Sequence, residues 1–276
     1  MQKIRRIIKI RRHNFMSFYF EIIVQKNQLW YNVNQIGETS MKLLLCSDFS
    51  DVGYRWVKKF FKNTNGLNVL FVGYAKEDDT KDDTESGAYV RFMEMKMNVT
   101  ILHKDYDFKD KFDIVFVRGG NTTKLIHYLK KYGQFDKIKN IAEEGALYIG
   151  NSAGAILAGT ETEYTLDSEP YAVDLKKEFA DQNALKGYGW IDKFLLVHCS
   201  KYRMAWDFEK DYPEEIFRTL DRECYPAYLV DRKRFDKSTY IKLGNNEALF
   251  VNGEEQKILR YDWRNIPVKI VNHDTI

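Results

Sequence analysis

Short apolar runs alternate with amphipathic segments from residue 41 to about residue 158 of the chain. Apolar runs of roughly four to six residues are typical of strands, and segments with apolar residues three or four positions apart are typical of helices. The alternation predicts an α/β fold with a mostly parallel sheet and helices on both of its faces. The expected strands cover residues 42–46, 68–73, 99–103, 113–117 and 146–149, and the expected helices cover residues 52–61, 88–95, 123–130 and 135–144.

The pattern changes in the C-terminal part of the chain. An apolar run at residues 194–197 predicts one more strand, and short strands are expected at residues 228–230, 239–243, 248–251 and 256–261. Turn sequences separate the last of these strands, at Gly244-Asn245-Asn246 and at Asn252-Gly253. Such turns between short strands are typical of hairpins, so we expect a C-terminal β-hairpin region.

The first forty residues differ from the rest. Isoleucines alternate with six lysines and arginines over residues 1–12, and no apolar run in the sequence approaches the roughly 20 residues that a membrane span requires. We expect residues 1–40 to be a basic N-terminal extension outside the core and residues 41–276 to form a single domain. The extension can be interpreted as a surface arm, a transit-like segment or the product of a misassigned start codon.

Composition narrows the class of protein. The 276 residues can bury one large core, and the 43 basic and 40 acidic residues leave a net charge of +3, too balanced to indicate a nucleic-acid partner. The three cysteines, Cys46, Cys199 and Cys224, form no CxxC pair. An odd cysteine count without such a pair predicts reduced thiols in a cytoplasmic protein, with no disulfide framework and no metal site.

The segment Gly150-Asn151-Ser152-Ala153-Gly154 lies between a predicted strand and a helix-like run. This strand, Gly-x-Ser-x-Gly, helix context is that of a nucleophile elbow, in which a sharp turn exposes the serine hydroxyl. The amide of Ala153 lies at a helix N-terminus and can donate to a developing oxyanion. We therefore predict Ser152 as a nucleophile, and a tight-packing turn before a helix is the alternative.

A second glycine turn, Arg118-Gly119-Gly120-Asn121, follows the strand at residues 113–117. Gly120 precedes Ser152 by 32 residues, about the span of one βαβ unit. Two neighbouring parallel strands would deliver both turns to the same sheet edge, where the amide of Gly120 can be the second oxyanion donor. Asn121 is also a good helix N-cap, and the two roles are compatible.

A serine hydroxyl needs a base before it can attack a carbonyl. Of the five histidines, only His198 and His273 follow the elbow, and His198 comes at the end of a predicted strand. Because the carboxyl ends of parallel strands are where ligands meet an α/β sheet, His198 is the predicted base. A core or capped imidazole is the alternative for this residue.

The sequence Val-Arg-Gly-Gly-Asn-Thr, followed by Tyr-Ile-Gly-Asn-Ser-Ala-Gly-Ala, resembles the serine peptidases of the aspartyl dipeptidase (peptidase E) and cyanophycinase family. The resemblance covers about residues 41–253. It implies a flavodoxin-like three-layer sandwich, related to class I glutamine amidotransferases but with Ser in place of their Cys. It also implies peptidase chemistry, often at aspartyl bonds, without a cofactor. The family's histidine follows its serine by a few tens of residues, as His198 does, although relatives carry Pro where this chain has Val197.

The third member of the site has two candidates. Asp167 lies near the position where relatives carry an aspartate implicated in function, and the Asn245–Glu247 turn lies where relatives carry an acid in a late loop. The acid position itself corresponds to Asn245, which can orient an imidazole but cannot neutralise an imidazolium. A surface-loop acid and an ordinary turn are the alternatives for these two places.

The sequence offers few candidates for residues that recognise the substrate. The carboxylate of an aspartyl substrate is best bound by an arginine, whose guanidinium can donate two hydrogen bonds to it. Arg118 and Arg203 are the candidates for this role, and Asn121 is a further predicted substrate ligand. The overall prediction is a cytoplasmic serine peptidase for small peptides, monomeric or homodimeric, acting on neither nucleic acid nor membranes. The alternatives are an α/β-hydrolase esterase using His273, a non-catalytic binding relative, and an amidotransferase-like partner subunit.

Overall fold

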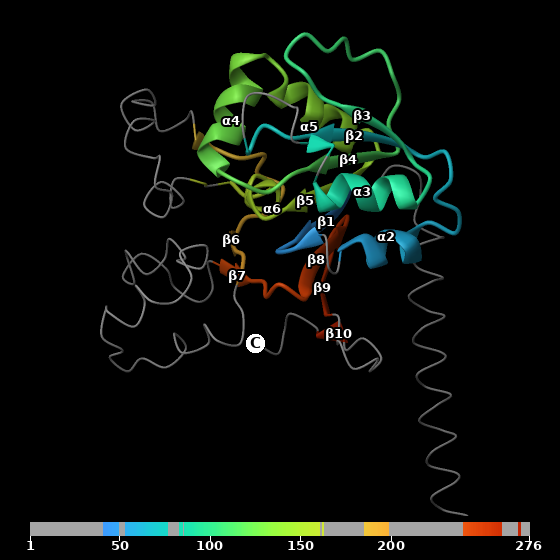
Figure 1. Ribbon diagram of the computed structural model, residues 1–276. Coiled ribbons are helices and arrows are strands. Elements are labelled where there is room, and N and C mark those ends of the chain that lie inside the picture. The colour runs from blue at the N-terminus through green and yellow to red at the C-terminus, as the bar shows by residue number, and fades with distance from the viewer. Residues whose placement is uncertain are drawn as a thin grey trace, which may run out of the picture. The chain divides into compact units, whose positions relative to one another are not determined.

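The computed structural model describes residues 41–49, 53–76, 83–84, 86–160, 162, 185–198, 240–260 and 270–271, all within one compact unit, Thr39–Ile276. Its centre is a sheet of eight strands in the order β10-β9-β8-β1-β5-β4-β2-β3 (Figure 1). The predicted extension, residues 1–40, lies outside the described residues and stays a prediction. The strands of this sheet are β1 (Lys42–Cys46), β2 (Asn68–Val72), β3 (Asn98–Ile101), β4 (Ile114–Val117), β5 (Leu147–Asn151), β8 (Glu247–Asn252), β9 (Glu255–Arg260) and β10 (Ile270–Val271).

The five strands from β1 to β3 in this order run parallel, as the alternating pattern predicts. Helices cover both faces of these strands. Successive residues of a strand point to opposite faces, and both sets are therefore buried. Leu43 and Leu45 pack on one face with α4, α5 and α6, whereas Leu44 and Cys46 pack on the other with α2 and α3. The helices are α2 (Tyr54–Phe60), α3 (Gly87–Glu94), α4 (Thr122–Lys131), α5 (Phe135–Glu143) and α6 (Ala153–Ile156).

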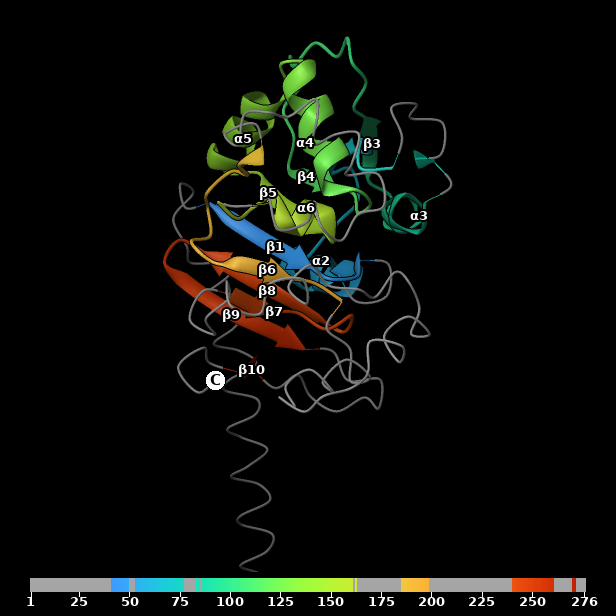
Figure 2. The same ribbon diagram turned by 90° about the vertical axis from the view of Figure 1, so that its left-hand side faces the viewer.

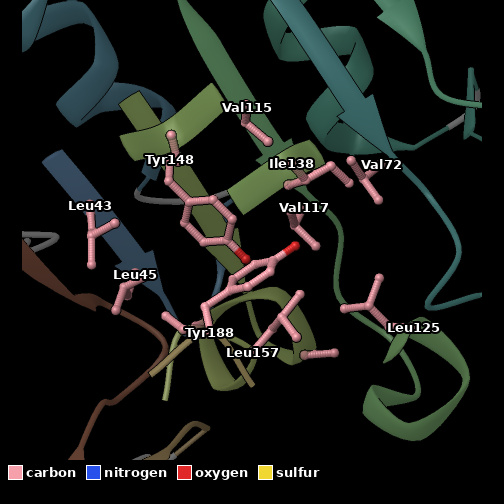
Figure 3. Close-up of a cluster of buried hydrophobic side chains, with 14 of the residues drawn as sticks. Leu43, Leu45, Val72, Val115, Val117, Leu125, Ile138, Tyr148, Leu157 and Tyr188 are labelled. Carbon is pink, nitrogen blue, oxygen red and sulfur yellow. The ribbon is translucent and has the colours of Figure 1, made fainter. Parts of the chain in front are cut away.

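The face covered by α4, α5 and α6 is a continuous apolar cluster (Figure 3). Side chains from β1, β4 and β5 meet Leu125 of α4, Ile138 of α5 and Leu157 just after α6. Burial on both faces explains why the strands are continuous apolar runs in the sequence instead of alternating ones.

Of the two hairpin turns expected in the C-terminal region, the prediction is confirmed for the second and wrong for the first. Strands β8 and β9 form the hairpin around Asn252-Gly253, and β8 pairs antiparallel with β1 (Figure 2). The strand before Gly244 does not turn back on β8. Instead β7 (Tyr240–Lys242) pairs in parallel with β6 (Phe194–Leu196) in a separate two-stranded sheet. The strand expected at residues 228–230 lies outside the described residues.

Candidate active site

Two pairs of parallel strands carry the candidate residues. Strands β1 and β5 pair with Cys46 opposite Asn151, so Ser47 and Ser152 follow the ends of neighbouring strands. Strands β6 and β7 pair with Leu196 opposite Lys242, and His198 and Asn245 follow a few residues later. The amide of Leu243 donates to the carbonyl of Leu196 at 2.8 Å, which extends this pairing toward the site. Parallel pairing thus assembles residues that are far apart in the sequence.

Ser152 occupies a strained backbone position. Its φ of 50° and ψ of −107° lie in a region that side-chain-bearing residues rarely adopt, as expected of the serine in a nucleophile elbow. Its amide donates to the carbonyl of Cys46 at 2.9 Å, and its carbonyl accepts from Ala155 and Ile156 at the start of α6. Hydrogen bonds with the end of β1 on one side and with α6 on the other therefore hold Ser152 in this strained conformation.

The second glycine turn lies directly against the elbow, as predicted. A Cβ added to Gly119 would lie 2.9 Å from the Cβ of Ser152. One added to Gly154 would lie 2.2 Å from the carbonyl oxygen of Val117, at the end of β4. Only residues without side chains allow the two turns to approach this closely.

The amides of Gly120 and Ala153 were predicted to bind an oxyanion. Within the described parts of the chain, neither amide donates a hydrogen bond to another group. Gly120 has a φ of 145°, and the next amide, that of Asn121, donates to the carbonyl of Ala75 at 2.6 Å. Both candidate donors are thus available, and their role stays a prediction.

His198 joins Ser152 to the turn before β8. Its Nε2 lies 2.9 Å from Oγ of Ser152, and its Nδ1 lies 2.9 Å from Oδ1 of Asn245. With the proton on Nδ1, Nε2 can accept the serine proton. His198 itself has a φ of 61°, a second strained non-glycine residue in the site.

Ser47 was not predicted and is nevertheless part of this cluster. It is fully buried, and its Oγ accepts from the amide of His198 at 2.5 Å and donates to Oδ1 of Asn245 at 3.3 Å. Next to it, the amide of Phe49 donates to Oδ1 of Asn151 at 2.9 Å, which ties the segment after β1 to the elbow. A polar residue directly after a core strand was the available signal for Ser47.

The remaining predicted residues have other partners or lie elsewhere. Oδ1 of Asn121 caps α4 by accepting from the amide of Lys124 at 2.7 Å, so its predicted capping role is confirmed and its substrate role stays a prediction. Glu247 accepts from the amide of Gly244 at 2.8 Å and pairs with Arg260, so it closes the turn that presents Asn245. The other candidates, Asp167, Arg203 and His273, lie outside the described residues.

Arg118 follows β4 but is engaged in an ion pair. Its guanidinium lies 2.6 Å from Oδ1 of Asp83, and only 13% of the Arg118 side chain and 3% of the Asp83 side chain are exposed. A cation already matched by a buried carboxylate is a poor candidate for binding a second one, since the first interaction would be weakened. The structure therefore does not favour Arg118 as the ligand of a substrate carboxylate.

A buried tyrosine supports the elbow helix. Tyr148 of β5 donates from its hydroxyl to the carbonyl of Gly154 at 2.7 Å, and burial raises the pKa of this phenol so that it stays protonated. The neighbouring Tyr188 is also buried, and its hydroxyl has no hydrogen-bond partner within the described ranges. Figure 3 shows both rings in the same apolar cluster.

These two tyrosines form a matched pair for a stability test. Tyr148→Phe should lower the free energy of unfolding by about 1–2 kcal/mol, because it leaves the Gly154 carbonyl without its donor. Tyr188→Phe should be neutral or stabilising, because it removes a buried hydroxyl that lacks a partner. Urea denaturation of both variants measures the difference, and equal effects would contradict the role of the Tyr148 hydrogen bond.

The described residues contain no group of three or more His, Cys, Asp or Glu side chains that could hold a metal ion. No helix among them is long and apolar enough to cross a membrane. What the site brings together is a hydroxyl, an imidazole, a side-chain amide and available backbone amides. Such a set can carry out acyl transfer without an added group.

Comparison with known proteins assigns the family. The sequence matches the model of peptidase family S51 over residues 43–259, well over half of the chain. The chain belongs to peptidase family S51. This assignment removes the α/β-hydrolase alternative, in which a late histidine would have acted as the base.

Individual members of family S51 resemble the chain to different extents. Peptidase E of Haemophilus influenzae (strain ATCC 51907 / DSM 11121 / KW20 / Rd) is 29% identical over 136 residues, 46% of this chain and 62% of that protein. An uncharacterized peptidase of Pasteurella multocida (strain Pm70) is 29% identical over 233 residues, 79% of this chain and 97% of that protein. The chain thus spans less than two thirds of the length of the former relative.

The fold of family S51 is also found among solved structures. A candidate peptidase E protein of Listeria monocytogenes EGD-e superposes with a TM-score of 0.58 at 22% identity, covering 81% of this chain and all of that one. The fold is flavodoxin-like, of the class I glutamine amidotransferase type, as the glycine motifs implied. At this identity the likeness supports the fold alone.

Proposed function

We propose that this S51 family member is a serine peptidase that hydrolyses small peptides, with Ser152 as nucleophile and His198 as general base. The observation that carries the proposal is the 2.9 Å contact between Oγ of Ser152 and Nε2 of His198, at a strained elbow. Relatives named peptidase E support the reaction class. The partner is then a small peptide, and we propose no cofactor.

The reaction divides into two acyl transfers. Oγ of Ser152 attacks the peptide carbonyl while Nε2 of His198 takes its proton, and the amides of Gly120 and Ala153 stabilise the oxyanion. The imidazolium then protonates the leaving amine as the C–N bond breaks. Water attacks the acyl-enzyme, with His198 again as the base, which releases the acid and restores the Ser152 hydroxyl.

Two finer points belong to the same proposal. A preference for aspartyl bonds rests on the family resemblance. Arg203 is the remaining candidate for binding the substrate carboxylate, because Arg118 is paired with Asp83. A cytoplasmic location fits the buried free thiol of Cys46, whose pKa is raised by burial and which is therefore unreactive as a nucleophile. Both points can be tested separately from the nucleophile.

A fluorophosphonate probe tests the central claim. The probe should form a covalent adduct at Ser152, mapped by mass spectrometry of the digested protein, because it reacts with serines activated by a neighbouring base. Ser152→Ala should abolish the adduct, and Ser86→Ala, at the buried N-cap of α3, should leave it unchanged. A wild-type protein that stays unlabelled and does not cleave a panel of Asp-X dipeptides would favour a non-catalytic binding relative instead.

Substitution of Asn245 tests which residue orients the imidazole of His198 as the third member of the proposed site. Asn245→Asp should keep or raise kcat/KM, because a carboxylate at Nδ1 stabilises the imidazolium that an amide can only orient. The acidic limb of the pH profile should move to higher pH, since a neighbouring negative charge favours the protonated imidazole. The comparison variant is Asp167→Asn: if it costs about 10⁴-fold while Asn245→Asp changes neither rate nor profile, Asp167 is the third member.

A further inference from the structure

Ser47 contacts two groups of the proposed site without reaching the nucleophile. Its hydroxyl is the acceptor for the His198 amide at 2.5 Å and lies 3.3 Å from Oδ1 of Asn245. Nδ1 of His198 lies 3.5 Å from the same hydroxyl and 2.9 Å from Oδ1 of Asn245. Three polar groups therefore meet within hydrogen-bond distance around a side chain that is fully buried.

One arrangement of protons satisfies the three shorter contacts, at 2.5, 2.9 and 3.3 Å, together. The Ser47 oxygen already accepts from the His198 amide, so its own proton must go to an acceptor. Oδ1 of Asn245 has two lone pairs and can accept both from Ser47 and from a proton on Nδ1 of His198. If the amide of Asn245 were turned over, its NH₂ group would take the lone pair of Nδ1, and the Ser47 proton would have no acceptor within the cluster.

We propose that Ser47 is a positioning residue that fixes the amide orientation of Asn245 and thereby holds His198 in the tautomer with its proton on Nδ1. The inference rests on the proposed function for its catalytic meaning. A base for Ser152 needs the lone pair of Nε2 facing the serine hydroxyl, and this tautomer provides it. An asparagine has an amide that can face either way, whereas a carboxylate accepts hydrogen bonds through both oxygens. The asparagine at position 245 is thus what makes Ser47 necessary.

The direct test is NMR of the full-length chain labelled with ¹⁵N at histidine, at a pH where the imidazoles are neutral. Long-range ¹H–¹⁵N correlations should show His198, assigned by its loss in His198→Gln, with a protonated Nδ1 and an unprotonated Nε2. In Ser47→Ala, the tautomer with the proton on Nε2 should become populated. Ser86→Ala removes another buried serine hydroxyl, one that caps α3, and should leave the His198 pattern unchanged.

A double-mutant cycle separates this role from mere support of the fold. Ser47→Ala should lower kcat/KM between about 10-fold and 10⁴-fold, the latter being the cost of a wrong tautomer in a serine triad. In the Asn245→Asp background the same substitution should cost less than about threefold, because a carboxylate cannot present an N–H to Nδ1. Should Ser47→Ala fail to fold, Ser47→Cys keeps the shape of the side chain and weakens its hydrogen bonds.

Two results would overturn the inference: a wild-type tautomer in both Ser47→Ala and Ser47→Cys, or the same loss of activity in the wild-type and Asn245→Asp backgrounds. The second result would mean that Ser47 acts only by supporting the His198 backbone. The spectra do not depend on turnover. A protein without hydrolytic activity whose His198 tautomer still responds to Ser47 would therefore refute the proposed function and leave the role of Ser47 intact.

Discussion

Ser152→Ala is expected to abolish peptide hydrolysis, with a loss of kcat on the order of 10⁴-fold or more, because nucleophile and base act as a unit. The folded state should be almost unaffected. The substitution removes one half-buried hydroxyl, and the backbone contacts that hold the elbow, from the Ser152 amide to Cys46 and from α6 to its carbonyl, do not involve the side chain.

The measurement is kcat/KM on a small panel of Asp-X dipeptides, together with thermal melts of both proteins. The melting temperatures should agree within a few degrees, which makes lost activity attributable to chemistry and not to unfolding. Hydrolysis that continues at the wild-type rate in Ser152→Ala would refute the mechanism. Activity that disappears together with cooperative melting would show that the serine is structural.

His198→Ala is expected to inactivate the protein as completely as Ser152→Ala. Nε2 of its imidazole lies 2.9 Å from Oγ of Ser152, and in the part of the chain that the structure describes no other histidine forms a hydrogen bond with Ser152. The double variant, Ser152→Ala with His198→Ala, should be no less active than either single variant, because removal of one partner already disables the pair. Kinetics of the three variants on the same dipeptides test this non-additivity.

His273→Ala is the matched control for the base, since it removes the other histidine that follows the elbow. It should leave kcat/KM within about twofold of wild type, because the imidazole of His198 already lies 2.9 Å from Oγ of Ser152. Inactivation by His273→Ala with activity retained in His198→Ala would show that the base is the other histidine and refute the proposed pair.

The apolar pattern was enough to predict the layered fold. Continuous runs such as Leu43–Leu45 can be buried only in a sheet covered on both faces, and the glycines around Ser152 predict a sharp strand-to-helix turn. The positions of Ser152 and His198 were predictable because each residue follows an apolar run, and the carboxyl ends of parallel strands are where ligands meet an α/β sheet. These features depend on local chemistry and periodicity, which the sequence carries in full.

The pairing of short strands was not predictable in the same way. The turn at Gly244-Asn245-Asn246 has the composition of a hairpin, yet β7 pairs with β6, which lies more than forty residues earlier in the sequence. Strands β6 and β7 have only three residues each, so their local preferences are weak. Hydrogen bonding and burial in the folded protein therefore decide which strand β7 pairs with. This choice brings Asn245 to His198.

The sequence by itself therefore determined the sheet, the elbow and the two chemically distinctive residues, Ser152 and His198. Only the tertiary structure decided which groups surround them. It joins Asn245 to the imidazole, commits Glu247 to the turn and Arg118 to Asp83, and buries Ser47 between strands. The physical reason is clearest for Ser47, whose partners His198 and Asn245 lie 151 and 198 positions away in the sequence: such contacts depend on strand register and burial, and no local pattern encodes either.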